Sequence, residues 1–246
     1  MQRMTYSFLQ NDPELLTPER MREGAIFSDL DDRVLERLVP ISELRRVEAD
    51  APLFNQGDHN APLFVLLSGQ VSTFRTAPDG TVTVVEVIQS TGHVGLAAVL
   101  TQLPALTGAE TVSASQLLAV ESAGLRALLP EEPSLANALL KAEAMAFRSL
   151  VLQVCDLKLR TTAQRLGHYL LELAPEGETR SAILRLPFDK RLLAARLGCR
   201  QENLSRAFAT LRDIGVETRG ARVVLNDIPR LRHYAVAHEV RDAFTG

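Results

Sequence analysis

Cysteine is scarce in this chain of 246 residues, which has only Cys155 and Cys199. The two lie far apart in the sequence, beside charged or polar neighbours, so neither a disulfide framework nor a metal site made of thiolates alone is supported. An iron–sulfur cluster that needs several Cys ligands is excluded within one chain for the same reason. We expect both residues to be reduced thiols.

Long apolar runs are also missing. No stretch approaches the length that crosses a bilayer, and the first eight residues lack the apolar segment and small-residue cleavage site of a secretory signal. We therefore expect a cytoplasmic protein with no membrane partner. The composition, 46% hydrophobic and 23% charged, is ordinary for a globular chain with one large or two modest domains.

Charge is present but unevenly spread. Residues 158–246 contain 16 Lys and Arg against 10 Asp and Glu, whereas residues 1–157 contain 11 against 20. The net charge of −3 therefore combines an acidic part with a basic part that follows it. The basic part is where we expect a polyanion partner such as double-stranded DNA to bind.

The periodicity of apolar residues changes twice within the first 130 residues. Residues 1–24 show no sustained period and predict an N-terminal arm. A short amphipathic helix is then expected, with Ser28 as its N-cap and Pro40 as its end, because apolar residues recur at helical spacing; these are Leu30, Val34, Leu35 and Leu38. From about residue 44 to 120, short apolar or alternating runs are separated by Gly-bearing turns, which is typical of a small antiparallel barrel or sandwich.

A long helix is predicted over residues 133–157, because Pro133 can open it and no further Pro or Gly appears until Gly167. Apolar residues four and three apart, with one carboxylate among them, form a stripe typical of a coiled-coil dimer contact. The stripe consists of Ala136, Leu140, Glu143, Phe147, Leu150, Val154 and Leu157. The alternative is a helix that packs only on its own barrel. A second helix is expected over residues 161–173.

The most specific local pattern is a helix-turn-helix in residues 189–208. Asp189 can cap a first helix, and Ala194, Gly198 and Leu204 have the spacing at which two helices touch, turn and lock together. The apolar face continues through Leu211, and a strand pair about Arg219-Gly220 then predicts a wing. We expect a winged helix-turn-helix that reads DNA.

Two sets of DNA contacts follow from this element. Residues of the second helix that face away from its apolar side suit base edges in a major groove: Gln201, Glu202, Ser205 and Arg206. Other cations suit phosphates, which position the protein without specifying sequence: Lys190, Arg191, Arg200, Arg219 and Arg222. The alternative is a solvated helix face with a Glu–Arg pair four residues apart.

Residues 25–235 resemble the Crp/Fnr superfamily of bacterial transcription regulators. The resemblance rests on barrel glycines (Gly57, Gly69, Gly80 and Gly92), on residues 53–58 before the strand end at 66–69, on the long helix and on residues 198–206. It implies an α+β architecture: an N-terminal arm (1–24), an antiparallel β-barrel sensor domain of jelly-roll type (25–130), a dimerisation helix (131–157) and a winged helix-turn-helix domain (158–246). It also implies a homodimer, RNA polymerase as a partner, and no enzymatic activity.

The departures from the superfamily bear on the effector. Cyclic-AMP-binding members carry a Glu after a Gly and then an Arg-Ser pair, but residues 92–98 and 103–109 contain neither the Glu nor the Arg, so cyclic AMP is not expected. Oxygen-sensing members use an N-terminal Cys cluster, and residues 1–40 have no Cys. Glu202, Ser205 and Arg206 are similar to the anaerobic and nitric-oxide-responsive branch, which implies half-sites close to TTGAT, arranged as TTGAT-N4-ATCAA.

The effector itself stays open. The corresponding stretch is nearly all apolar, which favours an apolar or haem-like ligand, or none. His93 could be a haem axial ligand, or it is a turn histidine without a ligand; His59 is more simply a loop residue. Oxidation of Cys199 could obstruct DNA contact, or this thiol only packs the turn. A cyclic-nucleotide regulator with a divergent pocket and a cupin-type metalloenzyme are the rival functions, although the barrel lacks close-spaced metal ligands.

Overall fold

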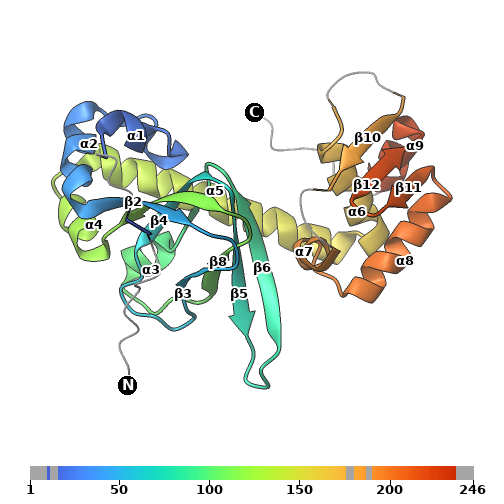
Figure 1. The fold of residues 1–246 in the computed structure, drawn as a ribbon, viewed down its shortest axis with the longest axis horizontal. Coiled ribbons are helices and arrows are strands. Elements are labelled where there is room, and N and C mark those ends of the chain that lie inside the picture. The colour runs from blue at the N-terminus through green and yellow to red at the C-terminus, as the bar shows by residue number, and fades with distance from the viewer. Residues whose placement is uncertain (1–9, 12–15, 176–179, 187–189, 237–246) are drawn as a thin grey trace. The chain divides into compact units, whose positions relative to one another are not determined.

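The computed structural model describes residues 10–11, 16–175, 180–186 and 190–236 (Figure 1). The chain forms two compact units, residues 1–148 and residues 149–246. Each unit is described by itself below. The helix α5 (Pro133–Leu159) runs across the boundary between them.

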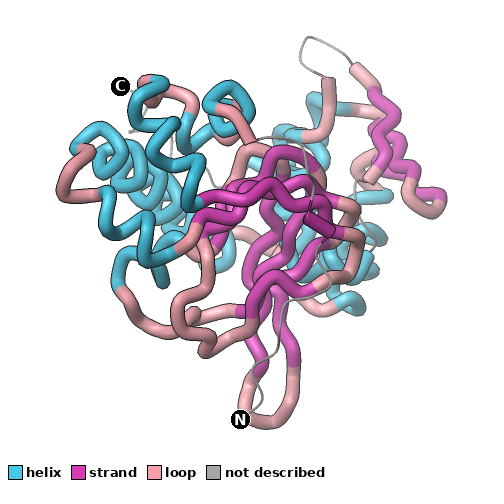
Figure 2. Tube along the Cα trace, turned by 60° about the vertical axis from the view of Figure 1, so that its left-hand side comes forward, coloured by secondary structure: helices cyan, strands magenta, loops and turns pink. Residues whose placement is uncertain are grey.

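The first unit contains two antiparallel sheets. The order in the five-stranded sheet is β1 (Gln10–Asn11), β2 (Ser42–Val47), β9 (Ser115–Val120), β4 (Leu63–Ser68), β7 (His93–Val94). The order in the four-stranded sheet is β3 (Pro52–Phe54), β8 (Gly108–Thr111), β5 (Gln70–Thr76), β6 (Val82–Gln89). The predicted fold class is confirmed, although the barrel consists of two sheets rather than one closed sheet. Figure 2 shows these strands as one block.

Strand β4 explains why one run of the sequence is apolar without alternation. Phe64 and Leu66 point into a core between the sheets, where the rings of Phe54 and Phe64 stack 6.2 Å apart. Leu63 and Val65 point to the other side, into a core shared with the helices. Because successive side chains of a strand face opposite ways, a strand with a core on each side is apolar throughout.

The helices of the first unit border the second of these cores. They are α1 (Pro18–Arg22), α2 (Asp32–Leu38), α3 (Leu96–Thr101), α4 (Ser122–Leu128) and the first part of α5, with 3-10 turns at Ala25–Phe27 and Val39–Ile41. In Figure 1, α1, α2 and α4 lie together at one end of the unit and the β5–β6 hairpin extends from the other.

Two expectations for the N-terminal segment need correction. Residues 18–22 do not belong to a loose arm, because they form α1 and bury Met21 completely in the core. Ser28 does not cap the next helix: its hydroxyl donates to the Ala25 carbonyl, and Asp31 occupies the N-cap of α2. Residues 1–9 and 12–15 lie outside the described part of the chain.

Three of the four barrel glycines have left-handed backbones: φ is +86° at Gly57, +92° at Gly69 and +83° at Gly80. Gly92 differs, because the left-handed residue at that turn is Thr91 (φ +77°). A Cβ on Gly92 would instead lie 2.3 Å from Cγ2 of Ile88, so glycine is needed there for close packing.

An ion-pair cluster holds the start of α5 to α2. Glu132 is 1% exposed, and its two carboxylate oxygens accept hydrogen bonds from Arg33 (2.7 Å) and Arg37 (2.6 Å). Both guanidiniums lower the pKa of Glu132, Arg37 most strongly. Leu135 and Leu139, on the first turns of α5, are buried in the helical core next to this cluster.

The second unit is a small three-stranded antiparallel sheet with helices. The sheet order is β10 (Ala182–Arg185), β12 (Arg222–Leu225), β11 (Val216–Arg219), and the helices are α6 (Thr162–Glu172), α7 (Lys190–Arg196), α8 (Gln201–Arg212) and α9 (Ile228–Val236). Helix α6 begins with a capping box in which Thr161 and Gln164 satisfy each other's backbone amides. Among the described residues no helix is long and apolar enough to cross a bilayer.

Candidate nucleic-acid interface

Helices α7 and α8 form the predicted helix-turn-helix. Ala194 (2% exposed) and Leu204 (1% exposed) lie at the contact between the helices, and Gly198 has φ +60° in the turn. The Cys199 amide donates to the Ala194 carbonyl (2.9 Å), which closes the end of α7. The predicted triple is therefore confirmed. Asp189, the predicted cap of the first helix, lies outside the described residues.

One side of α8 is buried in the second unit. Leu204, Ala207, Phe208 and Leu211 are all at most 7% exposed. Burial of a Leu or Phe side chain contributes roughly 1.5–3 kcal/mol, so this face fixes the rotation of the helix about its axis. The opposite face is thereby held toward solvent.

That opposite face carries the four predicted base-reading residues. Gln201, Glu202, Ser205 and Arg206 are all exposed, on the first two turns of α8. The Ser205 hydroxyl donates to the Gln201 carbonyl (3.1 Å), so without DNA its lone pairs are free to accept, and donation to a base requires the hydroxyl to rotate. The face offers donors from Arg206 and Gln201 and acceptors from Glu202 and Ser205.

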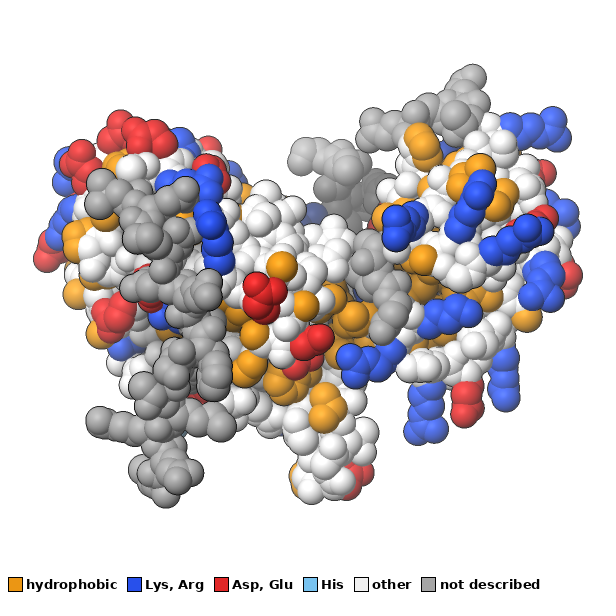
Figure 3. Space-filling model, viewed as in Figure 1, with side chains coloured by type: hydrophobic (Ala, Val, Ile, Leu, Met, Phe, Trp, Pro, Cys, Tyr) orange, Lys and Arg blue, Asp and Glu red, His pale blue; other side chains and the backbone are white. Residues whose placement is uncertain are grey.

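The predicted phosphate contacts are exposed as well, in the same unit. Arg191 lies on α7, Arg200 occupies the N-cap of α8, and Arg219 and Arg222 flank the turn of the β11–β12 wing. The Lys190 ammonium lies 5.9 Å from the centre of the Phe208 ring, a cation–π distance. Figure 3 shows many Lys and Arg side chains and few Asp and Glu on the visible face of this unit.

Contacts of two side chains, which sequence reasoning missed, tie the turn to the end of α5. The Arg165 guanidinium donates to the Leu197 carbonyl (2.9 Å) in the turn and to the Arg160 carbonyl (2.7 Å) just after α5. Leu157 packs so closely on Gly198 that a Cβ there would lie 2.4 Å from its Cδ2. Partial burial lowers the pKa of Arg165, but an arginine stays charged.

The stripe predicted for dimerisation is exposed along most of α5. Leu140 and Phe147 are 67% and 66% exposed, and the side chains of Leu150, Val154 and Leu157 are also open, whereas Ala136 is half-buried. Partial burial raises the pKa of Glu143, the one carboxylate of the stripe. A second set of exposed apolar residues, seven positions apart on the helix, was not predicted: Met145, Leu152 and Leu159.

The stretch expected to hold an effector is only partly buried. Residues 92–109 contain no charged side chain. Leu96 and Val99 of α3 are buried in the core, whereas Leu103 and Leu106, which follow the helix, are exposed. Gly108 faces the Phe74 ring, since a Cβ on it would lie 2.4 Å from that ring. Nothing in this stretch supplies a counter-charge for a cyclic phosphate.

His93 belongs to strand β7 rather than to a turn, with its backbone paired to Val65. Desolvation lowers its pKa, so its imidazole is neutral at neutral pH. In the described part of the chain, no three His, Cys, Asp or Glu side chains gather as a metal site. His59 lies exposed in the loop before β4.

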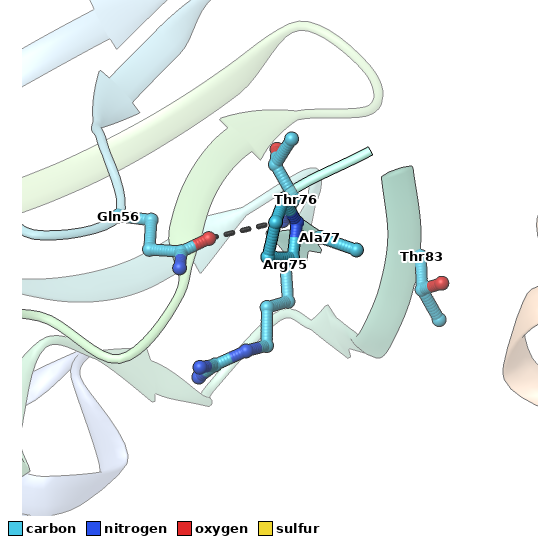
Figure 4. A pocket seen from close by; sticks show the side chains of 6 residues that line it. Gln56, Arg75, Thr76, Ala77 and Thr83 are labelled. Carbon is cyan, nitrogen blue, oxygen red and sulfur yellow. Dashed lines mark hydrogen bonds between the residues drawn. The ribbon is translucent and has the colours of Figure 1, made fainter. Parts of the chain in front are cut away.

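A hollow in the first unit lies elsewhere, beside the turn end of the β5–β6 hairpin (Figure 4). It is lined by Gln56, Arg75, Thr76, Ala77, Pro78 and Thr83. The Gln56 side chain accepts from the Thr76 amide (2.9 Å), and Arg75 donates to the Leu106 carbonyl (3.2 Å). Both polar side chains thus hold loops in place.

Cys199 is half-buried in the turn between α7 and α8. Desolvation raises the pKa of its thiol, and the charge of Arg165 only partly opposes this. Since the thiolate is the reactive form, the surroundings disfavour oxidation of Cys199 at neutral pH. Cys155 is exposed on α5.

Comparison with known proteins gives two matching sequence families. The cyclic nucleotide-binding domain matches residues 44–132, and the Crp-like helix-turn-helix domain matches residues 164–234. A CRP-like cAMP-activated global transcriptional regulator of Mycobacterium tuberculosis is 24% identical over 187 residues, which cover 74% of this chain and 84% of the relative.

Solved structures of similar fold agree with these two family matches. The crystal structure of a proposed cyclic nucleotide binding protein from Ruegeria pomeroyi is 30% identical, with a TM-score of 0.60 and coverage of 89% of this chain and 96% of that one. The c-di-GMP responsive global regulator of Xanthomonas campestris has the same fold at 22% identity, with a TM-score of 0.67 over 79% of this chain and 99% of that one. By their names, the relative from Mycobacterium tuberculosis is a transcriptional regulator and the one from Xanthomonas campestris regulates gene expression. The domain order, the helix-turn-helix and the similarity to these proteins show that the chain belongs to the Crp/Fnr family of transcription regulators.

Proposed function

We propose that this regulator binds, as a homodimer, an inverted-repeat promoter site close to TTGAT-N4-ATCAA. The observation that carries the proposal is the exposed face of α8, where Gln201, Glu202, Ser205 and Arg206 stand opposite a buried face that fixes their direction. Two such helices related by a two-fold axis and one helical turn apart require an inverted repeat.

The half-site follows from the chemistry of this face. Arg206 is assigned to the guanine of TTGAT, because a guanidinium pairs bidentately with its O6 and N7. Glu202 is assigned to the amino group of the paired cytosine or of a neighbouring base, and Ser205 to a thymine edge. Gln201 stands where the catabolite branch has Arg, so the additional guanine of a TGTGA half-site goes unread. This assignment to the anaerobic branch is part of the proposal.

The homodimer is supported by the exposed stripe of α5. Leu140, Phe147, Leu150 and Val154 are large apolar side chains open to solvent on one face of a 27-residue helix. A second copy of the same stripe would bury them in a coiled-coil contact. Partial burial already raises the pKa of Glu143, and further desolvation in that contact would raise it more.

For the sensor unit we propose that cyclic AMP is not the effector, although the relative in Mycobacterium tuberculosis is cAMP-activated. Residues 92–109 offer no cation for the phosphate and no carboxylate for the ribose. Calorimetry with cyclic AMP and cyclic GMP tests this, and binding of either at micromolar concentration would refute it.

A haem at His93, another apolar ligand, redox control through Cys199 and the absence of any effector remain as alternatives. The half-buried, neutral imidazole of His93 suits an axial ligand. The absorption spectrum of protein purified with and without added haem tests the first of these: a Soret band that His93→Ala removes supports haem, and an unchanged spectrum contradicts it.

DNA binding itself is tested with short duplexes. The full-length protein should bind a TTGAT-N4-ATCAA duplex at least a thousandfold more tightly than a duplex of the same composition with scrambled half-sites, the usual ratio of specific to non-specific binding. A duplex with only one intact half-site is the control for two-fold binding, and it should bind far more weakly. Equal affinity for all three duplexes would contradict the proposal.

A further inference from the structure

The register of the wing sheet places three arginines side by side. Arg185 at the end of β10 lies opposite Arg222 of β12, and Arg222 lies opposite Arg219 of β11. Residues directly opposite on antiparallel strands have Cβ atoms about 4.5–5.5 Å apart and share one face of the sheet. All three side chains are exposed. We call Arg185, Arg222 and Arg219 the arginine row.

The row lies at the turn of the wing. The Leu186 amide, directly after Arg185, donates to the Ala221 carbonyl (2.8 Å), so the end of β10 is fixed to the residues between β11 and β12. On the other face of the sheet, Leu184 and Val223 are buried. Because side chains alternate along a strand, the arginines are held on the outward face.

Nothing in the described part of the chain neutralises the row. None of the three arginines forms an ion pair with a described residue. Glu217 lies on the same face two residues from Arg219, but the carboxylate accepts a hydrogen bond from the Asn226 side chain (3.0 Å). Like charges directly opposite one another destabilise a sheet. The row therefore lowers the stability of the wing sheet unless an anion binds against it.

The row belongs to the same compact unit as the recognition helix. Strand β11 begins only four residues after α8 ends, and the Asn226 amide donates to the Gly215 carbonyl (2.9 Å) of that connection. Arg219 and Arg222 are already proposed phosphate contacts, so Arg185 extends that surface onto the strand that leads toward α7.

We propose that the arginine row binds the phosphate backbone of DNA beside the half-site, with Arg185 as a phosphate contact of its own. This rests on the proposed function. The occupant is a DNA strand because adjacent phosphates along a backbone match a row of point cations, and because the surface continues from the residues assigned to the duplex. Arg185 positions the protein and carries no sequence information.

The test is the salt dependence of DNA binding by the full-length protein. Each phosphate contact adds about 0.9 to the slope of log affinity against log salt, so Arg185→Gln should flatten the slope by roughly 2 for a dimer. Arg185→Lys should restore most of it, since a point charge suffices. Lys141→Gln, which removes an exposed charge from the first unit, is the matched control and should leave the slope unchanged.

The outcomes separate the two proposals. Failure of the unaltered protein to prefer the inverted repeat would overturn the proposed function itself. If that preference holds and Arg185→Gln keeps the original slope, the phosphate role of Arg185 is overturned. Arg185→Gln could also keep the original slope and yet lose transcription in an assay with purified components. That result would likewise overturn the phosphate role, and it would assign the row to a protein partner.

Discussion

At the scale of single residues, Arg206 bears most of the proposed specificity. Arg206→Ala should weaken binding by roughly 1–3 kcal/mol per half-site and relax the preference for guanine in TTGAT, because the bidentate contact is lost. Arg212→Ala on the same helix removes an equal charge from its last turn and should leave the guanine preference intact. Competition binding with duplexes changed at that one base pair measures both effects.

Ser205 bears on the neighbouring positions of the half-site. Ser205→Gly removes the hydroxyl that is bonded to the Gln201 carbonyl and leaves the residue found in the catabolite branch. The preferred half-site should then move toward TGTGA. Competition between duplexes of the two types measures the shift, and an unchanged ranking would remove Ser205 from the contacts to bases.

Gly198 tests how the turn is built. Gly198→Ala forces a Cβ into a left-handed backbone and to within 2.4 Å of Leu157, so the free energy of unfolding should fall by about 1–3 kcal/mol. Gly220 in the wing has a similar φ of +63°, but a Cβ there would have no neighbour within 4 Å. The loss of stability in Gly220→Ala therefore measures the cost of the left-handed backbone alone. Denaturant unfolding of both variants compares them. Equal losses would show that Leu157 does not press on the turn.

At the scale of elements, α5 presents two exposed apolar faces. Phe147→Asp should place two charges in a desolvated contact and weaken the dimer by several kcal/mol. Met145→Asp adds the same charge on the second face, defined by Met145, Leu152 and Leu159, and should leave the dimer intact. Sedimentation measures both. If Met145→Asp dissociates the dimer and Phe147→Asp does not, the interface lies on the second face.

Elements with a strong period could be predicted from the sequence. The α5 helix and the Ala194, Gly198 and Leu204 triple were predictable because each depends on spacing along one segment. Helix α1 and strand β10 were not. Helix α1 is five residues long and buries only Met21, and β10 is four residues whose pairing partner Arg222–Leu225 lies far along the chain.

The same distinction holds in the candidate site. The exposed face of α8 could be predicted, because the buried apolar positions leave only one side of a helix for solvent. The contacts of Arg165 with Leu197 and Arg160 could not, because a long side chain reaches backbone carbonyls whose positions depend on the tertiary fold. The arginine row needed the strand register, because Arg185 pairs with Arg222, 37 positions further along the chain, with no local pattern.

At the scale of the whole molecule, the basic second unit predicts binding that weakens steeply as salt rises. Arg219→Gln should flatten the salt slope without changing the preferred sequence, because a phosphate contact carries no base information. Titration of labelled duplex at several salt concentrations gives the slope. A changed sequence preference would instead make Arg219 a base reader.

The central claim is that a homodimer reads two TTGAT half-sites with opposite orientation. Selection of binding sites from a random duplex library by the full-length protein tests it most directly. We expect the enriched motif to be an inverted repeat of TTGAT and ATCAA separated by four base pairs. A motif without two-fold symmetry, or an inverted repeat that lacks the guanine assigned to Arg206, would contradict it.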